Sequence, residues 1–262
     1  MAGQGIMHVR DFVTSPRFDY VAGVKDSWTR QIVMVKGASP DAPCYFVIND
    51  ALHVAGPAIW RLWCTAQEVV PGAKSARVIG KEDVDLDVIF LNAGDVPVRT
   101  EPKTRTSGSG MFPNWNWRGM ETTQLGVLAN LPRTDGFTVL LYPRLKTAPP
   151  PRLTTDLGGK VVKVEHEAGT DYVFLSSTPF TFDQGDIHFA GMAGMIQLRG
   201  NDVIVAMGSG GTVSARSKTA TSAAPLPKVA NTKGPTDGWM TLETTLGPEG
   251  SGAAITWPPG IT

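Results

Sequence analysis

The chain has 262 residues, of which 42% are hydrophobic, and its 24 Lys plus Arg balance 24 Asp plus Glu to a formal net charge of zero. This length and composition can bury a sizeable core, and the balanced charge offers no basic excess for nucleic acid. No apolar run approaches the roughly 18 residues of a membrane span, so we expect neither nucleic acid nor a membrane as a partner.

The opening MAGQGIMHVRDF has neither the basic start nor the apolar core of a signal peptide. The sequence as it stands therefore predicts no export. If the chain is a fragment, a signal would stand on a preceding part.

Short apolar runs and alternating patterns recur along the chain, whereas helical spacing of apolar residues soon meets Gly or Pro. Two tight hairpin turns are predicted, at Glu167–Thr170 and Arg199–Asp202. The fold predicted is all-β, a supersandwich-like antiparallel β-sandwich with long loops and an irregular C-terminal tail. Its predicted strands are Gln31–Lys36, Cys44–Ile48, Ile59–Cys64, Asp85–Leu91, Thr138–Pro143, Val161–Glu165, Tyr172–Ser176, Met195–Arg199 and Asp202–Met207.

The segment ALHVAGP separates two of these strands and suggests a hairpin centred on Val54. Symmetric pairing would place Cys44 opposite Cys64, at a Cα separation of about 4.5 to 5.5 Å that a disulfide can span. Two buried free thiols are the alternative. In either case, two cysteines exclude a disulfide scaffold and a multi-cysteine zinc site.

Composition divides the chain into a sandwich over residues 1–215 and a linker-like extended tail over 216–262, which is small, polar and proline-bearing. Within the first part, the long stretch 100–119 turns aromatic at Trp115 and Trp117, and Arg118 follows them. Indole rings stack on sugars and Arg binds carboxylates, so these residues are candidates for binding an acidic saccharide. The alternative is that the tryptophans anchor the loop onto the sandwich.

Residues with catalytic or metal-binding chemistry are scattered. The four histidines, at positions 8, 53, 166 and 188, stand singly, and only Asp183, Asp186 and His188 approach a ligand set, with a solvated strand face as the alternative. Asp83, Asp85 and Asp87 alternate as on an exposed strand face. The glycine run 208–211 lacks the lysine of a phosphate loop and predicts a bulged turn. We therefore assign no catalytic residue, metal site or cofactor.

Four segments carry a family resemblance: FVTSPRFDYVAGVKDSW, RQIVMVK, CYFVINDAL and WRLWC. Together they resemble the C-terminal β-rich region of heparinase II/III-like polysaccharide lyases, from about Val9 to Ser214 and most strongly before Thr65. The resemblance makes Asp50 a structural acid at a strand end, accepting backbone N–H bonds where the chain turns. A metal ligand or a base at this position is the alternative. Trp28 departs from the family's usual Tyr, and Cys64 stands where a His often ends the strand.

Lyases of this family carry an upstream α/α toroid with a catalytic Tyr, followed by segments with a histidine and zinc ligands, and none of these motifs occurs in this sequence. The resemblance implies the β-sandwich portion of a lyase for uronate-containing polysaccharide, inactive alone, with its catalytic toroid domain upstream or in another chain. It also implies a periplasmic or extracellular location. The alternative is a noncatalytic carbohydrate-binding or structural module.

Overall fold

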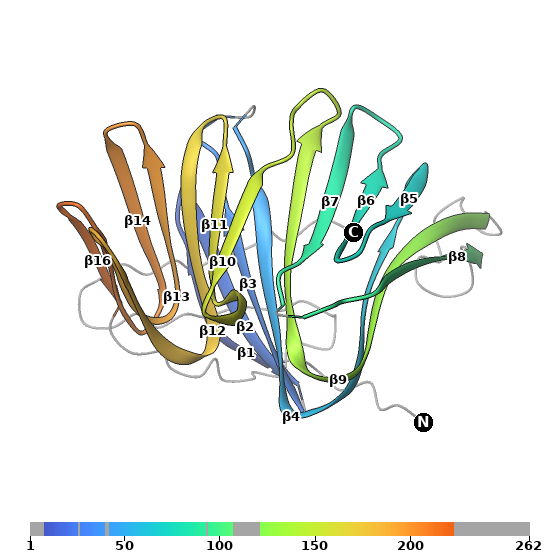
Figure 1. Cartoon of the computed structure of the whole chain (residues 1–262), viewed down its shortest axis with the longest axis horizontal. Coiled ribbons are helices and arrows are strands. Elements are labelled where there is room, and N and C mark those ends of the chain that lie inside the picture. Colours follow the sequence, from blue (N-terminus) through green and yellow to red (C-terminus); the bar gives the residue numbers. More distant parts are fainter. Residues whose placement is uncertain (1–7, 26, 40–41, 93, 107–120, 223–262) are drawn as a thin grey trace, which may run out of the picture.

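The computed structural model describes residues 8–25, 27–39, 42–92, 94–106 and 121–222, and most of this backbone is in β-strands (Figure 1). The predicted saccharide-binding residues Trp115, Trp117 and Arg118 lie outside the described residues, as does 223–262 of the predicted tail. Among the described residues, no helix has the length and apolar character needed to cross a membrane.

The first sheet has nine strands in the order β1-β2-β3-β4-β9-β7-β6-β5, and β8 pairs with β9 beside this path. All of its pairs are antiparallel. Its strands are β1 (His8–Thr14), β2 (Phe18–Lys25), β3 (Trp28–Val35), β4 (Tyr45–Cys64), β5 (Glu68–Pro71), β6 (Ser75–Ile79), β7 (Val84–Phe90), β8 (Val98–Thr106) and β9 (Glu121–Leu145).

The second sheet has seven strands in the order β10-β11-β12-β13-β15-β16, and β14 pairs with β13. A short 3-10 turn, η1 (Leu157–Gly159), joins the first two strands of this sheet. Its strands are β10 (Arg152–Asp156), β11 (Val161–His166), β12 (Gly169–Gln184), β13 (Ile187–Arg199), β14 (Asp202–Ser209), β15 (Gly211–Ala215) and β16 (Lys218–Ser222). The last strand lies within the predicted tail region.

The two sheets face each other over a common core, and β12 contacts β3 and β4 across it. Alternate residues of the facing strands point into this core, as the period of two requires. Its fully buried members include Phe18, Val47, Leu140, Val173 and Met195. The prediction of an all-β antiparallel sandwich is confirmed.

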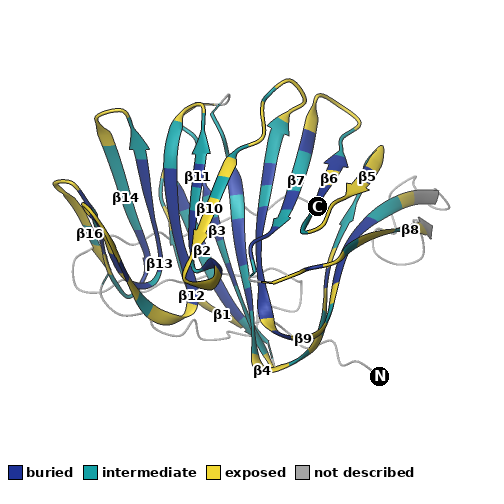
Figure 2. Cartoon of the chain, viewed as in Figure 1, coloured by how far each residue is buried: buried dark blue, intermediate teal, exposed yellow. Residues whose placement is uncertain are grey.

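Each sheet also folds over on itself and encloses a core of its own. In the first sheet, β4 and β9 bend together, and their far halves pack with β8 over β5 to β7 around Trp60 and Phe90, whose rings meet edge to face at 5.3 Å. In the second sheet, the curled strands enclose Phe174 and Phe189, stacked at 4.4 Å. Figure 2 shows buried positions along the strands and exposed ones at the hairpin ends and on the far arm of the first sheet.

The predicted hairpin about Val54 is wrong, because β4 is one strand that runs through this point. It pairs with β9 on both sides of a bend, where the register shifts between Ala51 and Gly56 and again between Gly56 and Ala58. Cys64 therefore ends this 20-residue strand, while Cys44 directly precedes its first residue, Tyr45, and both are free thiols. A strand bulge uses the same residue types as a turn, which explains the error.

Candidate functional site

The bent halves of β4 and β9 form an arm with β8, in which β9 lies between the other two strands. Across this arm Leu128 has Arg61 on one side and Arg99 on the other. Because alternate strand residues point to opposite faces, and Val127 and Ala129 are in the core beneath, these side chains lie on the outer side. We call this outer side the arm face, made of Arg61, Trp63, Arg99, Glu101, Lys103 and Gln124 around the buried Gly126 and Leu128.

Trp63 lies against the backbone of Gly126, its partner on β9. A Cβ atom at Gly126 would lie 2.8 Å from the indole Cζ3 atom, so the missing side chain makes room for the ring. The Nζ atom of Lys103 stands 5.3 Å from the centre of this ring. A cation over an indole at this distance contributes about 0.5 to 1 kcal/mol at an exposed site. The arm face thus presents a half-buried aromatic ring with an exposed lysine beside it.

The described side chains of the arm face include three cations and one acid. Arg99 and Glu101 form an ion pair of 2.9 Å, whereas Arg61 and Lys103 have no ion-pair partner among the described residues. An indole can stack on a sugar ring while free cations bind carboxylates or sulfates. The face therefore has the chemistry to hold an acidic saccharide. Neither Arg61 nor Trp63 nor Lys103 was predicted as a site residue, because only the strand register brings them together.

The loop with the predicted residues Trp115, Trp117 and Arg118 connects β8 to β9, the two strands that carry the far part of the arm face. Those three residues are outside the described part of the chain, so their role as saccharide ligands stays a prediction.

The polar residues of the sequence motifs hold the fold together. Asp50 does not end a strand, and its carboxylate binds Arg30 rather than backbone N–H groups, with Nε–Oδ1 at 2.6 Å and Nη2–Oδ2 at 2.8 Å. The prediction that Asp50 caps a strand end by accepting backbone N–H bonds is wrong. Strand β4 continues past Asp50 and places it directly opposite Arg30 of β3. In the same region Lys36 binds Asp19 at 2.7 Å.

The strongest predicted ligand set does not converge on a metal. His188 and Asp183 are cross-strand partners joined at 2.7 Å, while Asp186 lies in the turn and has Arg216 at 3.8 Å. Within the ranges that the structure describes, no three His, Cys, Asp or Glu side chains form a metal-binding group.

Of the three aspartates predicted to lie on an exposed strand face, Asp83 is exposed, whereas Asp85 is buried and Asp87 is half-buried, which corrects the prediction for these two. Asp85 is 2% exposed and accepts hydrogen bonds from Arg77 and from the Gly80 N–H. Asp87 pairs with Arg144 at 2.6 Å. Both carboxylates are held by arginines of neighbouring strands, which sequence alternation cannot reveal.

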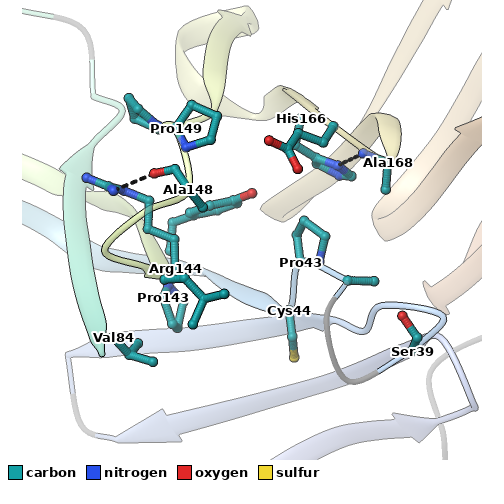
Figure 3. A pocket seen from close by; sticks show the side chains of 15 residues that line it. Ser39, Pro43, Cys44, Val84, Pro143, Arg144, Ala148, Pro149, His166 and Ala168 are labelled. Atoms are coloured by element: carbon teal, nitrogen blue, oxygen red, sulfur yellow. Dashed lines mark hydrogen bonds between the residues drawn. The ribbon is translucent and has the colours of Figure 1, made fainter. Parts of the chain in front are cut away.

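A cavity of about 580 Å³ opens at the other end of β9, between its last residues, the segment before β4 and the turn between β11 and β12 (Figure 3). Four prolines and the side chains of Val84 and Leu145 supply much of its apolar wall. The polar lining residues are Ser39, Cys44, Tyr142, Arg144, His166 and Glu167.

His166 beside this cavity is fully engaged by hydrogen bonds. The Ala168 N–H donates to its Nδ1 at 3.2 Å, so Nε2 carries the proton and donates to Asp171 at 3.0 Å. Asp171 is 0% exposed and also binds the Tyr45 hydroxyl at 2.8 Å and Arg199 at 2.6 Å. With both ring nitrogens occupied, His166 serves the fold and is not free to act as a base.

The tyrosines near these polar groups are poorly suited to proton abstraction. Burial, together with the charges of Asp171 and Glu167, raises the pKa of Tyr142 to about 12. Burial likewise raises the pKa of Tyr20 to about 12, although the hydrogen bond from Gln31 opposes it. A general base works best with a pKa near the operating pH, so both phenols act as neutral hydrogen-bonding groups.

Comparison with known proteins gives one likeness of shape. No family model matches the chain, and no curated protein matches it. Among solved structures, it is similar to the heparan sulfate lyase HepC from Pedobacter heparinus and to a mutant of that enzyme, with TM-scores of 0.48 and sequence identities of 11% and 10%. The matches cover 64% of this chain and 28% of each lyase chain. A likeness at this level establishes neither activity nor substrate.

Proposed function

We propose that this chain is the β-sandwich portion of a heparinase II/III-like polysaccharide lyase and that it binds uronate-containing polysaccharide through the arm face. The observation that carries the binding role is that Trp63 shares the arm face with Arg61 and Lys103, two cations without an ion-pair partner among the described residues. A sugar ring can stack on the indole once the flexible Lys103 side chain moves aside to pair with a uronate carboxylate.

Two observations support the lyase-like architecture: the family resemblance, and the structural role of two residues of the motifs that carry it. The Arg of RQIVMVK and the Asp of CYFVINDAL are Arg30 and Asp50, which form one ion pair across β3 and β4. These two motifs therefore indicate the sandwich fold and not the elimination reaction.

In this proposal, catalysis depends on a toroid domain upstream or in another chain, and the sandwich holds the polymer. β-Elimination needs a neutralised uronate carboxylate and a base near its α-proton. The raised pKa values of Tyr20 and Tyr142 keep both phenols neutral, so in this proposal neither of them supplies the base. A periplasmic or extracellular location belongs to the same proposal.

Binding is tested by calorimetry with alginate and heparin oligosaccharides. We expect Trp63→Ala to weaken binding about fivefold to tenfold, the range that a lost aromatic contact gives. Arg61→Gln with Lys103→Gln should weaken it further and flatten its salt dependence, because exposed charges are screened within about 10 Å at 0.1 M salt.

Matched controls come from other strands. Trp28→Ala removes another indole that has a cation over it, here Arg30 at 4.8 Å. Arg152→Gln with Lys218→Gln removes two exposed cations from the second sheet. Both should bind as the wild type does. Equal losses in the control and arm-face variants would refute a specific face.

Catalysis is tested separately by the ultraviolet absorbance of unsaturated uronate. The purified chain should produce none from alginate, heparin, heparan sulfate or hyaluronate. Product formation that Tyr142→Phe abolishes would contradict the assignment of catalysis to another domain.

A further inference from the structure

The cavity at the end of β9 has a different chemistry from the arm face. It lies beyond the bend of β9, where Pro143 and Leu145 form part of its wall, whereas the arm face uses residues near Gly126. Val84 and Leu145 are 45% and 52% exposed, so an apolar surface continues out of the cavity. A ligand with an aliphatic part would cover this surface.

Of the charged side chains that line the cavity, one acid has no ion-pair partner among the described residues. Arg144 is neutralised by Asp87 at 2.6 Å and donates a second hydrogen bond to the Ala148 carbonyl at 2.8 Å (Figure 3). His166 is held by its neighbours through both ring nitrogens. Glu167, exposed at the rim, has no ion-pair partner among the described residues. The cavity is therefore net negative.

The Tyr142 hydroxyl offers a second polar contact to a ligand in the cavity. Tyr142 lines the cavity and is 3% exposed, yet its hydroxyl has no hydrogen-bond partner within the described part of the chain. Its ring is fixed by packing against Tyr45, with centroids 5.4 Å apart. The hydroxyl oxygen reaches the cavity, where a ligand can hydrogen-bond to it in place of water.

We propose that this cavity binds an ammonium or guanidinium group carried on an aliphatic stem. The stem packs on the prolines and on Val84 and Leu145, and the cation pairs with Glu167 and donates to the Tyr142 hydroxyl. The same charge disfavours a uronate carboxylate. This site is thus independent of the proposed polysaccharide-binding face and selects the opposite charge. A free alkylamine and a lysine or arginine side chain of another protein share this chemistry.

The test is an NMR titration of the full chain with three ligands of equal length: pentylamine, 1-pentanol and pentanoate. We expect pentylamine to shift the amide signals of Ala148 and Ala168 and to bind at least fivefold more tightly than pentanol, the gain of about 1 kcal/mol that an exposed ion pair can give. Pentanoate should bind least. Equal or tighter binding of pentanoate would overturn the proposal.

Variants separate the two polar contacts. Glu167→Gln should weaken pentylamine about fivefold and leave pentanol unchanged, since only the charge is lost. Glu165→Gln is the matched control, because this carboxylate is already paired with Lys163 at 2.7 Å, and it should change nothing. Tyr142→Phe keeps the ring packing and should weaken the amine by a smaller factor. Wild-type affinity in Glu167→Gln would refute the site.

The source of the cation is decided with N-acetyl-lysine methylamide and a lysine-containing peptide. Tighter binding of the peptide than of pentylamine assigns the cavity to a protein partner, and equal binding assigns it to a free amine. If neither pentylamine nor the two lysine compounds shifts any signal of the cavity, the proposal fails. None of these outcomes depends on polysaccharide binding.

Discussion

Arg30 and Asp50 stand directly opposite each other on β3 and β4 and share two hydrogen bonds, at 2.6 and 2.8 Å. The pair is asymmetric, because the Asp50 side chain is 8% exposed and the Arg30 side chain is 34% exposed. If Asp50 is removed, the remaining arginine can reach water. If Arg30 is removed, the remaining carboxylate cannot.

This asymmetry predicts unequal effects on stability. Arg30→Leu should lower the free energy of unfolding by about 3 kcal/mol or more, because it leaves a buried carboxylate without a partner. Asp50→Asn should cost only about 1 to 2 kcal/mol, the range of a weakened charge-assisted hydrogen bond. Urea denaturation of both variants measures the difference, and a larger loss for Asp50→Asn would contradict it.

The same variants separate a structural role from a metal-binding role for Asp50. We expect added zinc to leave the denaturation midpoints of the wild type and of Asp50→Asn unchanged. A large stabilisation by zinc that Asp50→Asn removes would restore the alternative of a metal ligand.

Local patterns were enough to predict much of the sheet structure. Alternation located parts of β3, β4, β7, β9 and β11 to β14, whereas β5, β6, β8 and β10 within the same range were not predicted. The turns at Glu167–Thr170 and Arg199–Asp202 join their strands as predicted. In the second turn, Gly200 adopts a φ of 57°, a conformation that favours glycine. Such turns are fixed by neighbouring residues, so the sequence reveals them directly.

Long-range register could not be predicted in the same way. The break at ALHVAGP resembles a turn locally, and only the pairing of β4 with β9 shows that it is a bend. The partners of Asp50 and Asp85 are arginines on adjacent strands, at positions that depend on register. The arm face depends on register too, because Trp63 and Lys103 are separated by β9 and meet over Gly126.

Gly126 itself offers a test of the arm face that changes no charge. In Gly126→Ala, the new Cβ would meet the Trp63 ring at 2.8 Å and the Leu128 side chain at 2.9 Å, so the indole must shift. We expect weaker binding of uronate oligosaccharides and a loss of stability of about 1 kcal/mol or more, as overpacking gives.

Gly56→Ala is the matched control for this substitution, because a Cβ there meets nothing closer than 4.0 Å. Calorimetry with the same oligosaccharides compares the two variants. Unchanged binding in Gly126→Ala would show that the position of the Trp63 ring does not matter for the saccharide.

The two cysteines should behave as independent thiols. Burial raises the pKa of the Cys44 thiol, although the Gly37 backbone and Lys36 oppose this, and burial raises that of Cys64. A thiol-specific reagent should therefore react more slowly with the folded chain than with free cysteine at pH 8, and faster as pH rises. In denaturant without reductant it should count two thiols, and a count of zero would reveal a disulfide.

Asp11 and Asp85 should have opposite effects on the pH dependence of stability. Burial raises the pKa of Asp11, although interactions with Ser209 and the Phe12 backbone lower it in part, and its Oδ2 atom has no hydrogen-bond partner within the described residues. For Asp85, burial also acts to raise the pKa, but the Gly80 N–H and Arg77 outweigh it and hold the pKa below its ordinary value of 3.8.

Linkage then fixes the sign for each residue. The charged form of Asp11 destabilises the fold at neutral pH, and this cost is relieved as pH falls through its raised folded pKa. The charged form of Asp85 stabilises the fold above the ordinary pKa, and this contribution is lost only as pH falls from about 4 through the depressed folded pKa. Asp11→Asn should therefore stabilise the chain at pH 7, and Asp85→Asn should destabilise it by about 1 to 3 kcal/mol.

Urea midpoints of the wild type and both variants at pH 7, 5 and 4 measure these effects. On acidification the advantage of Asp11→Asn should fade first, because its titration lies above 3.8, while the deficit of Asp85→Asn should persist at pH 4. If Asp11→Asn is instead less stable than the wild type at pH 7, the charged Asp11 carboxylate stabilises the fold, and the prediction is wrong. If the stability differences of the two variants from the wild type change with pH in parallel, the predicted opposite effects of Asp11 and Asp85 are wrong. A parallel change would come from the whole fold and not from the two carboxylates.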